Sequence, residues 1–557
     1  MHKKIKIAIL LLSVFFVLFS FTPSLYELFH AKDLPKERFF VLEHNYMFDY
    51  NFYLSRIREG GEGRWLVSEK YYNLPHAGSF FQIVYLYLGK IGNLLNLSPP
   101  AVYNLSRLLF GFTLLMLIGS YLLHFFPGWW AAVGYLLIVT SGSYPILIKM
   151  GTGWRFATHM GWWSAIDSLQ RITFIPHVLI GQIFLVLIVW QFVEDKSLKS
   201  LRLLKLMAWG VIGFIAGIIF PPTLIVVYTV FGVMSVIEFL ESKSPRLPKL
   251  LKKWTPRIVF VLLSFPSLVY LSLMFKVAPW SALALFDVQH RIILPYREYA
   301  LALGPILPLG VAGLLLALFN KEKKFMATAA WITSVALLFL IFEKVPQQSP
   351  SRFTEAMPYV PLGIFATYLF KTIWDWCQNL KFPLVKLVKI GSGVMVAVIV
   401  LVGIGVMASM VLWLTDQAYG KRIGAWQVPI GAQIAYPLKD FMDGVFYLRD
   451  HTPKNTVVLG YVTSGNFIPA YAGNYVYIGH ANTPDEDSKE KTAALFFSGK
   501  MNQNEGKEFL KRERVSYIYF GPQEKELGKI EDLVGIYPFL TSIYFNPKVV
   551  IYKTELF

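Results

Sequence analysis

Long runs of apolar residues recur through the first three quarters of this 557-residue chain, and they constrain its fold more than any other feature. About eleven of these runs are long enough to cross roughly 30 Å of hydrocarbon as α-helices. We expect membrane helices at about 5–25, 103–126, 129–148, 176–193, 205–220, 221–240, 257–276, 298–319, 325–343, 357–371 and 391–414. Only 16% of the residues are charged, whereas a soluble domain has about a quarter. The sequence therefore predicts a mainly α-helical, polytopic membrane bundle that covers residues 1–414.

The basic residues predict how the chain is oriented. Lys and Arg gather in every second loop, near 3–6, 196–205, 243–257, 321–324 and 371–389. Because cytoplasmic loops carry an excess of Lys and Arg, we expect a cytoplasmic N-terminus and, after an odd number of helices, an outer C-terminal region. This predicts a multi-pass protein of the cytoplasmic (inner) membrane. The loops also account for the net charge of +18, and no basic stripe alternates with base-stacking aromatic residues, so we expect no nucleic-acid partner.

The composition changes at about residue 415 to that of a soluble domain. Five segments are rich in β-branched and aromatic residues and predict short strands: NTVVLGYV, NYVYIGH, VSYIYFG, LTSIYFN and KVVIYKT. Helical patterns lie between them, in PLKDFMDGVFYLRDH, DEDSKEKTAALFFSG and EGKEFLKRER. This alternation predicts a small extracytoplasmic α/β domain over residues 415–557.

The first predicted outer loop, residues 26–102, contains a polar and aromatic stretch at 43–75. We expect a helix that Asn45 caps and that ends near Gly60, followed by an interfacial helix within 76–95. Spacing of i, i+3, i+4 and i+7 places four side chains on one face of the first helix: Asp49, Phe52, Tyr53 and Arg56. Two interpretations stay open: this face binds a polar group presented from lipid, or the helix is a solvated amphipathic helix lying on the membrane.

Other polar candidates also gather in the predicted outer loops, while the predicted helices have almost no ionisable groups at mid-depth. These candidates are Glu43, His76, Arg155, Asp167, Arg171, His177 and Arg352. Glu43 and Asp167 suggest a second acidic position or a divalent-metal site shared by two loops, which leaves a metal ion open as a cofactor. We expect a capping or headgroup contact for His76. For His480, in the segment IGHANTPDED, a structural role and an acceptor contact both stay open.

The layout of the chain resembles the class-C glycosyltransferases of the GT-C fold, a group that includes protein mannosyltransferases, lipid A aminoarabinose transferases and oligosaccharyltransferases. The resemblance is carried by Asp49 and Tyr53 in the first outer loop, by the interfacial helix, and by a Pro-led start of helix two with Arg107 near it. Many membrane helices and an exoplasmic α/β domain complete the plan. Members typically have Asp-Glu or Asp-Pro in the first loop, whereas Tyr50 follows Asp49 here.

The resemblance implies an enzyme that moves a sugar from a polyprenyl-phosphate carrier to a glycan, lipid or protein acceptor, usually with inversion. Asp49 would accept the proton of the acceptor hydroxyl as general base. Arg352 is the first choice for holding the donor phosphate, with Arg155, Arg171 and His177 as further choices. Five residues would support the site: Glu43, Tyr53, Arg56, His76 and Asp167.

Two other functions stay open on sequence alone. A transporter or flippase for lipid-linked glycans predicts polar groups at mid-depth, and few are present. A non-catalytic scaffold of the cell envelope predicts that Asp49 can be replaced without effect. The chain has no P-loop, Rossmann glycine fingerprint or nucleophile elbow, which argues against use of a nucleotide sugar at the cytoplasmic face.

Overall fold

The computed structural model describes residues 2–193, 203–242, 247–379, 383–424 and 435–555. The chain forms two compact units, which we describe one at a time. The first unit consists of Met1–Thr22, Ser106–Tyr270 and His290–Leu414. The second unit consists of Pro23–Leu105, Leu271–Gln289 and Thr415–Phe557. Parts of three expected basic inner loops, at 194–202, 243–246 and 380–382, lie outside the described residues.

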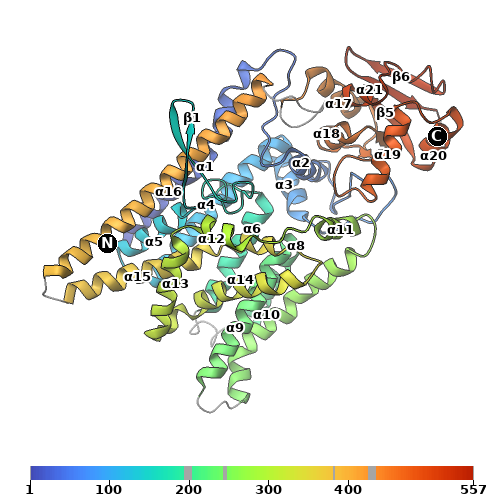
Figure 1. The fold of residues 1–557 in the computed structure, drawn as a ribbon. Helices are drawn as coiled ribbons and strands as arrows, with labels where there is room; N and C mark the ends of the chain where they lie inside the picture. Colours follow the sequence, from blue (N-terminus) through green and yellow to red (C-terminus); the bar gives the residue numbers. More distant parts are fainter. Residues whose placement is uncertain (1, 194–202, 243–246, 380–382, 425–434, 556–557) are drawn as a thin grey trace. The chain divides into compact units, whose positions relative to one another are not determined.

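The first unit is built from long apolar helices, of which α1, α4, α10 and α16 continue into the second unit. Figure 1 labels these helices along the chain, and their bounds are α1 (His2–Phe29), α4 (Pro99–Phe125), α5 (Trp129–Thr140), α6 (Pro176–Val193), α8 (Leu203–Ile219), α9 (Pro221–Glu241), α10 (Leu247–Met274), α12 (Tyr296–Leu303), α13 (Ile306–Phe319), α14 (Met326–Lys344), α15 (Tyr359–Asn379) and α16 (Pro383–Ile423). The 3₁₀ helices η2 (Lys323–Phe325) and η3 (Pro350–Ala356) also belong to this unit, and η1 (Ala31–Asp33) belongs to the second.

The described helices confirm a multi-pass membrane protein. Six of them are long and apolar enough to cross a bilayer: Lys3–Asp33, Pro99–Phe125, Pro221–Glu241, Leu247–Met274, Lys323–Lys344 and Val385–Ile423. The α12–α13 pair adds a seventh span if the two helices are counted together. Three more apolar helices are shorter, at Trp129–Thr140, Pro176–Phe192 and Leu204–Ile219. Each of the eleven expected segments thus overlaps a helix, but only some have the full spanning length.

Two expected helices have different shapes from those predicted. The helix expected at 298–319 is α12 and α13, which meet at an angle of 84°. Gly304 lies at the junction with φ +64°, and Pro305 follows it, so the helical hydrogen-bond pattern stops there. The helix expected at 129–148 ends at Thr140, and an antiparallel hairpin of β1 (Ile146–Met150) and β2 (Gly153–Ala157) follows. The hairpin lies against α16, where the Phe156 N–H donates to Ser409 Oγ at 3.1 Å (Figure 1).

The second unit contains the expected α/β domain. Its sheet has the order β4–β3–β5–β7–β6, in which β4, β3 and β5 are parallel and β7 is antiparallel to both neighbours. The strands are β3 (Val457–Leu459), β4 (Tyr475–Val476), β5 (Val515–Phe520), β6 (Leu540–Phe545) and β7 (Val550–Thr554). The helices of this domain are α17 (Lys439–His451), α18 (Val462–Tyr471), α19 (Glu486–Phe497), α20 (Gln503–Arg512) and α21 (Pro522–Gly528). Aromatic and aliphatic side chains such as Phe496, Ile518 and Tyr537 fill its core.

The same unit includes three helices from earlier in the chain: α2 (Met47–Gly61), α3 (Ile83–Leu94) and α11 (Ser281–Gln289). Of these, α2 packs against α18 of the α/β domain as well as against α3. The helix that carries Asp49 is therefore part of the same compact unit as the C-terminal sheet.

Candidate active site

The helices α2 and α3 pack closely enough to act as one block. A Cβ atom on Gly60 would lie 1.9 Å from the carbonyl oxygen of Leu86, and one on Gly89 would lie 1.8 Å from the carbonyl oxygen of Ile57. Only glycine allows backbones to approach this closely.

Asn45 does not cap α2 as expected, because Asn45 has φ +64° and Tyr46 occupies the N-cap position. The helix expected within 76–95 is α3, which lies inside that stretch but begins only at Ile83.

Asp49 lies in the first turn of α2 and contacts the C-terminal domain. Its Oδ1 lies 3.2 Å from Nε2 of His480, a residue 431 positions later in the chain. The Asp49 side chain is 43% exposed, whereas the His480 side chain is only 4% exposed. Arg56, which was expected on the same helix face, pairs with Glu69 instead of Asp49. Asp49 is therefore a solvent-accessible carboxylate with one oxygen in contact with the buried imidazole of His480.

The surroundings of His480 determine which ring nitrogen carries the proton. Its Nδ1 accepts a hydrogen bond from the Asn482 N–H at 3.0 Å. In the neutral ring the proton is then on Nε2, which donates to Asp49. The ring also stacks on Phe52, with centroids 4.5 Å apart and planes at 17°, and lies against Tyr71. Packing and hydrogen bonding thus fix the orientation in which His480 meets Asp49.

The helix α2 also carries Arg56, which is one member of a buried ion pair. Arg56 is 1% exposed and contacts Glu69 Oε2 at 3.3 Å, while another of its nitrogens donates to Gln82 Oε1. Its guanidinium lies 3.8 Å from the centroid of the Phe52 ring, the same ring on which His480 stacks. Burial raises the pKa of Glu69, and Arg56 partly offsets this effect. Arg56 therefore supports the position of Phe52 rather than facing an open site.

A second pair of buried charges follows one turn further along α2. Burial raises the pKa of Glu59 to about 7, although Lys70 and the Ser68 N–H, which donates to Glu59 Oε2, favour the charged form. Lys70 is equally buried and donates to the Gly473 carbonyl at 2.9 Å. Most side chains of α2 are buried, so the interpretation of a solvated amphipathic helix is wrong.

The other candidates from the first outer loop have structural contacts in the second unit. Tyr53 is buried and stacks on Tyr85 at 4.7 Å. Glu43 forms an ion pair with Lys421, and burial raises the pKa of Glu43. Nδ1 of His76 donates to the Leu74 carbonyl at 2.9 Å, and its Nε2 accepts from the Glu69 N–H at 2.9 Å.

Arg171 and Asp167, two candidate residues of the first unit, form hydrogen bonds with backbone groups of that unit. Nη2 of Arg171 donates to the carbonyl oxygens of Ile138, Val139 and Ser141, at the C-terminal end of α5. Asp167 Oδ1 accepts from two backbone N–H groups, those of Leu169 and Gln170. Burial raises the pKa of Asp167, against the effects of these N–H groups and of Arg171.

The three remaining cationic candidates also belong to the first unit. Arg155 is in β2, with its guanidinium 5.4 Å from the Trp413 ring centroid. His177 is in the first turn of α6, 9% exposed, with its ring edge-on to Phe220. Arg352 is half-buried in η3, directly ahead of α15. Their role in holding a donor phosphate stays a prediction.

Within the described ranges, no group of three or more His, Cys, Asp or Glu side chains is arranged to hold a metal ion. Glu43 and Asp167 are each engaged as described, with Lys421 and with backbone N–H groups. The carboxylates of Glu43 and Asp167 are therefore not arranged to share a metal ion.

The residue pattern does not predict the residues that surround Asp49. It links His480 to no other residue, and it does not predict that Glu69 and Lys70 are buried. One signal for a buried polar network is the polar composition of residues 43–75, because polar residues between apolar segments are either exposed to solvent or paired with one another in the interior. Nothing in the sequence shows that Asp49 and His480 meet.

No family model matches the chain, and no curated protein matches its sequence. Solved structures match its fold. The archaeal oligosaccharyltransferase AglB from Archaeoglobus fulgidus, in complex with an inhibitory peptide and a dolichol-phosphate, aligns with a TM-score of 0.52 and 11% identity over 92% of this chain and 69% of AglB. ArnT from Cupriavidus metallidurans, bound to undecaprenyl phosphate, aligns with a TM-score of 0.51 and 13% identity over 97% of each chain.

A third structure extends the comparison. The mycobacterial arabinofuranosyltransferase AftD aligns with a TM-score of 0.51 and 13% identity over 98% of this chain, which spans 40% of AftD. The chain has the GT-C fold of these membrane glycosyltransferases, as its resemblance to them in sequence layout implied.

Proposed function

We propose that this protein transfers a sugar from a polyprenyl-phosphate donor to an acceptor hydroxyl at the outer face of the cytoplasmic membrane. The observation that carries the proposal is the Asp49–His480 pair: a half-exposed carboxylate in a fixed orientation, outside the membrane spans, in a chain with the GT-C fold. AglB and ArnT, which share this fold, were solved with dolichol-phosphate and undecaprenyl phosphate respectively.

In the proposed reaction Asp49 is the general base. Oδ1 accepts from His480, which leaves Oδ2 for the proton of the acceptor hydroxyl. As that proton moves to Asp49, the hydroxyl oxygen bonds to the anomeric carbon, and the bond from this carbon to the phosphate oxygen breaks. The polyprenyl phosphate leaves with the electron pair, and the configuration inverts. Because phosphate is a good leaving group, one carboxylate is sufficient where glycoside hydrolases use two.

Fixed cations are needed to stabilise the charge that builds on the departing phosphate. Arg352 is the first candidate, because an arginine fork binds two phosphate oxygens at once and this residue lies directly ahead of α15. Arg155, Arg171 and His177 are the further candidates. Arg171 donates to three backbone carbonyls at the end of α5, so its replacement would also destabilise α5.

The test is sugar transfer from purified polyprenyl-phosphate sugars by the full-length protein and by Asp49→Asn. Loss of a general base lowers the rate by about 10²- to 10⁴-fold, and we expect a loss in this range. Asp33→Asn is a matched control, because Asp33 is a similarly exposed carboxylate (46%) of the same unit and forms an ordinary ion pair with Arg422. We expect it to keep wild-type activity. Equal activity of Asp49→Asn and wild type would exclude Asp49 as the base, and inactivity of the wild type with every donor would favour the scaffold or flippase interpretation.

A further inference from the structure

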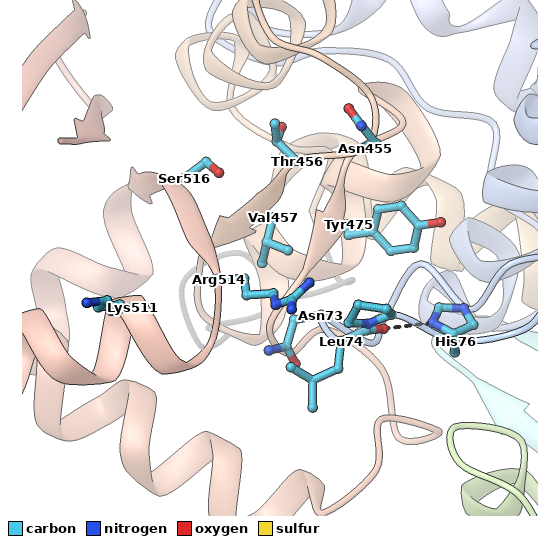
Figure 2. Close-up of a pocket in the computed structure, with 11 residues that line it drawn as sticks. Asn73, Leu74, His76, Asn455, Thr456, Val457, Tyr475, Lys511, Arg514 and Ser516 are labelled. Atoms are coloured by element: carbon cyan, nitrogen blue, oxygen red, sulfur yellow. Dashed lines mark hydrogen bonds between the residues drawn. The ribbon is translucent and has the colours of Figure 1, made fainter. Parts of the chain in front are cut away.

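The C-terminal domain has a pocket away from the Asp49–His480 pair. The pocket has a volume of about 750 Å³ and lies where the parallel strands β4, β3 and β5 begin, beside Tyr475, Val457 and Ser516. Residues 73–76 of the first outer loop form another wall (Figure 2). Asn73 fixes this wall to the domain, because its side chain donates to Glu513 and accepts from Lys489.

A cation without a protein partner extends into this pocket. Figure 2 shows the Arg514 side chain reaching into it from the turn between α20 and β5, while Lys511 lies at its edge. In the part of the chain that the structure describes, neither side chain forms a hydrogen bond or an ion pair. Other cations of this unit are engaged: Lys70 with Gly473, and Lys489 with Asn73. An unpaired guanidinium in a concave site favours an anionic ligand, because it binds both oxygens of a carboxylate or phosphate.

The rest of the lining suits a sugar. Tyr475 supplies an aromatic ring, and Asn455, Thr456 and Ser516 supply amide and hydroxyl groups. Sugar rings present hydroxyl groups and patches of C–H, and polar groups next to an aromatic ring satisfy both. Val457 and Leu74 add apolar surface beside these polar groups. The lining therefore favours an acidic glycan over an acidic peptide.

The position of the pocket defines the length of such a ligand. The chain runs from Tyr475, at the pocket, through β4 to His480, which contacts Asp49. Five residues of extended chain cover at most roughly 16 Å. The pocket and the Asp49–His480 pair therefore lie within reach of one glycan of several sugars.

We propose that this pocket binds an acidic glycan and holds the distal part of an acceptor whose reacting hydroxyl lies at Asp49. The assignment as acceptor rests on the proposed function, whereas binding itself does not. Binding energy from a part of the substrate remote from the reacting atoms favours long acceptors over short ones. The protein would accordingly select a growing acidic polysaccharide rather than a free monosaccharide.

The test is binding of a six-sugar oligomer of galacturonic acid to the full-length protein in detergent, measured calorimetrically without donor. Arg514→Gly removes the guanidinium without harming the fold, because Arg514 has φ +58°, which glycine adopts freely. Lys529→Gly is a matched control: Lys529 is exposed, has φ +51° and also loses one positive charge, but it does not line the pocket. We expect Arg514→Gly to weaken binding about tenfold or more and Lys529→Gly to bind as the wild type does.

Four results would overturn the proposal: no binding to the wild type, equal binding by Arg514→Gly, equal binding of a neutral galactose hexamer, or tighter Arg514-dependent binding of hexaglutamate. The last result would identify a peptide site. Asp49→Asn separates this proposal from the proposed function, since it should bind the acidic oligomer normally. If Asp49→Asn retains sugar transfer while Arg514→Gly loses binding, Asp49 is not the general base, but the pocket is still a glycan-binding site.

Discussion

Replacement of His480 by asparagine and by glutamine tests the Asp49–His480 pair, because each amide preserves a different one of its two hydrogen bonds. An asparagine amide oxygen can take the place of Nδ1 and keep the bond from the Asn482 N–H, but it has no donor at the Nε2 position. A glutamine amide nitrogen can take the place of Nε2 and donate to Asp49, but it loses the bond to Asn482. Both substitutions lose the stack on Phe52, so that effect cancels in their comparison.

The expected size of the effect follows from exposure. A hydrogen bond to a charged group contributes about 1.5–3 kcal/mol, and at a carboxylate that is 43% exposed we expect the lower end, because water replaces part of the lost bond. About 1.5 kcal/mol is roughly a tenfold change in rate. We therefore expect His480→Asn to lower kcat at least tenfold, with the KM for the donor nearly unchanged, and His480→Gln to retain most of the wild-type kcat.

The assay is the initial rate of sugar transfer at saturating donor, with thermal unfolding of each variant measured in the same detergent. Each variant loses one hydrogen bond, so similar losses of stability are expected, and only the rates should separate them. If His480→Asn keeps the wild-type kcat, or if His480→Gln falls as far as His480→Asn, His480 holds the 480–482 loop and does not position Asp49.

Two further predictions concern α2 and its neighbours. Burial raises the pKa of Glu59 from an ordinary value near 4.5 to about 7 in the folded state, so between these pH values the folded protein keeps a proton that the unfolded protein releases. The free energy of unfolding should therefore fall by about 3 kcal/mol as the pH rises from 4.5 to 7. Glu59→Gln should flatten this pH dependence in unfolding measurements at pH 5 to 8. A pH dependence identical in Glu59→Gln and wild type would refute this reasoning. Gly89→Ala should destabilise the protein by about 1–3 kcal/mol, because the new Cβ would meet the Ile57 carbonyl, whereas Gly232→Ala, with open space around it, should be neutral or stabilising in the same thermal assay. Equal unfolding temperatures for the two alanine variants would contradict the close α2–α3 packing.

The membrane helices could be predicted because their signal is local. An apolar run of spanning length has few structures open to it in a bilayer, so each expected segment overlaps a helix. The errors come from short interruptions. Gly304–Pro305 marks the break between α12 and α13, but it lies in a strongly apolar context that favours a continuous helix. Gly151 and Gly153 mark the turn of the β1–β2 hairpin, but they lie beyond the helix expected at 129–148, whose last residues form the start of β1.

The candidate site could be predicted only in part. The sequence identified Asp49 as the acidic residue of interest from its place in a polar loop, but it placed Arg56 beside Asp49 on the same helix face. In the structure Arg56 turns to Glu69 and Gln82, and the partner of Asp49 is His480. Helical spacing gives the neighbours of a side chain along one helix. It contains no information on a partner from a distant sheet.

The separation of Asp49 and His480 along the chain has a consequence for biosynthesis. Ribosomes add about 5–20 residues per second, so roughly 20 to 90 seconds pass between synthesis of Asp49 and of the histidine 431 positions later. During that time α2 emerges without the side chain that orients its carboxylate. If Asp49 acts as proposed, a nascent polypeptide would therefore work at least tenfold more slowly than the finished protein until His480 has been synthesised and has reached Asp49.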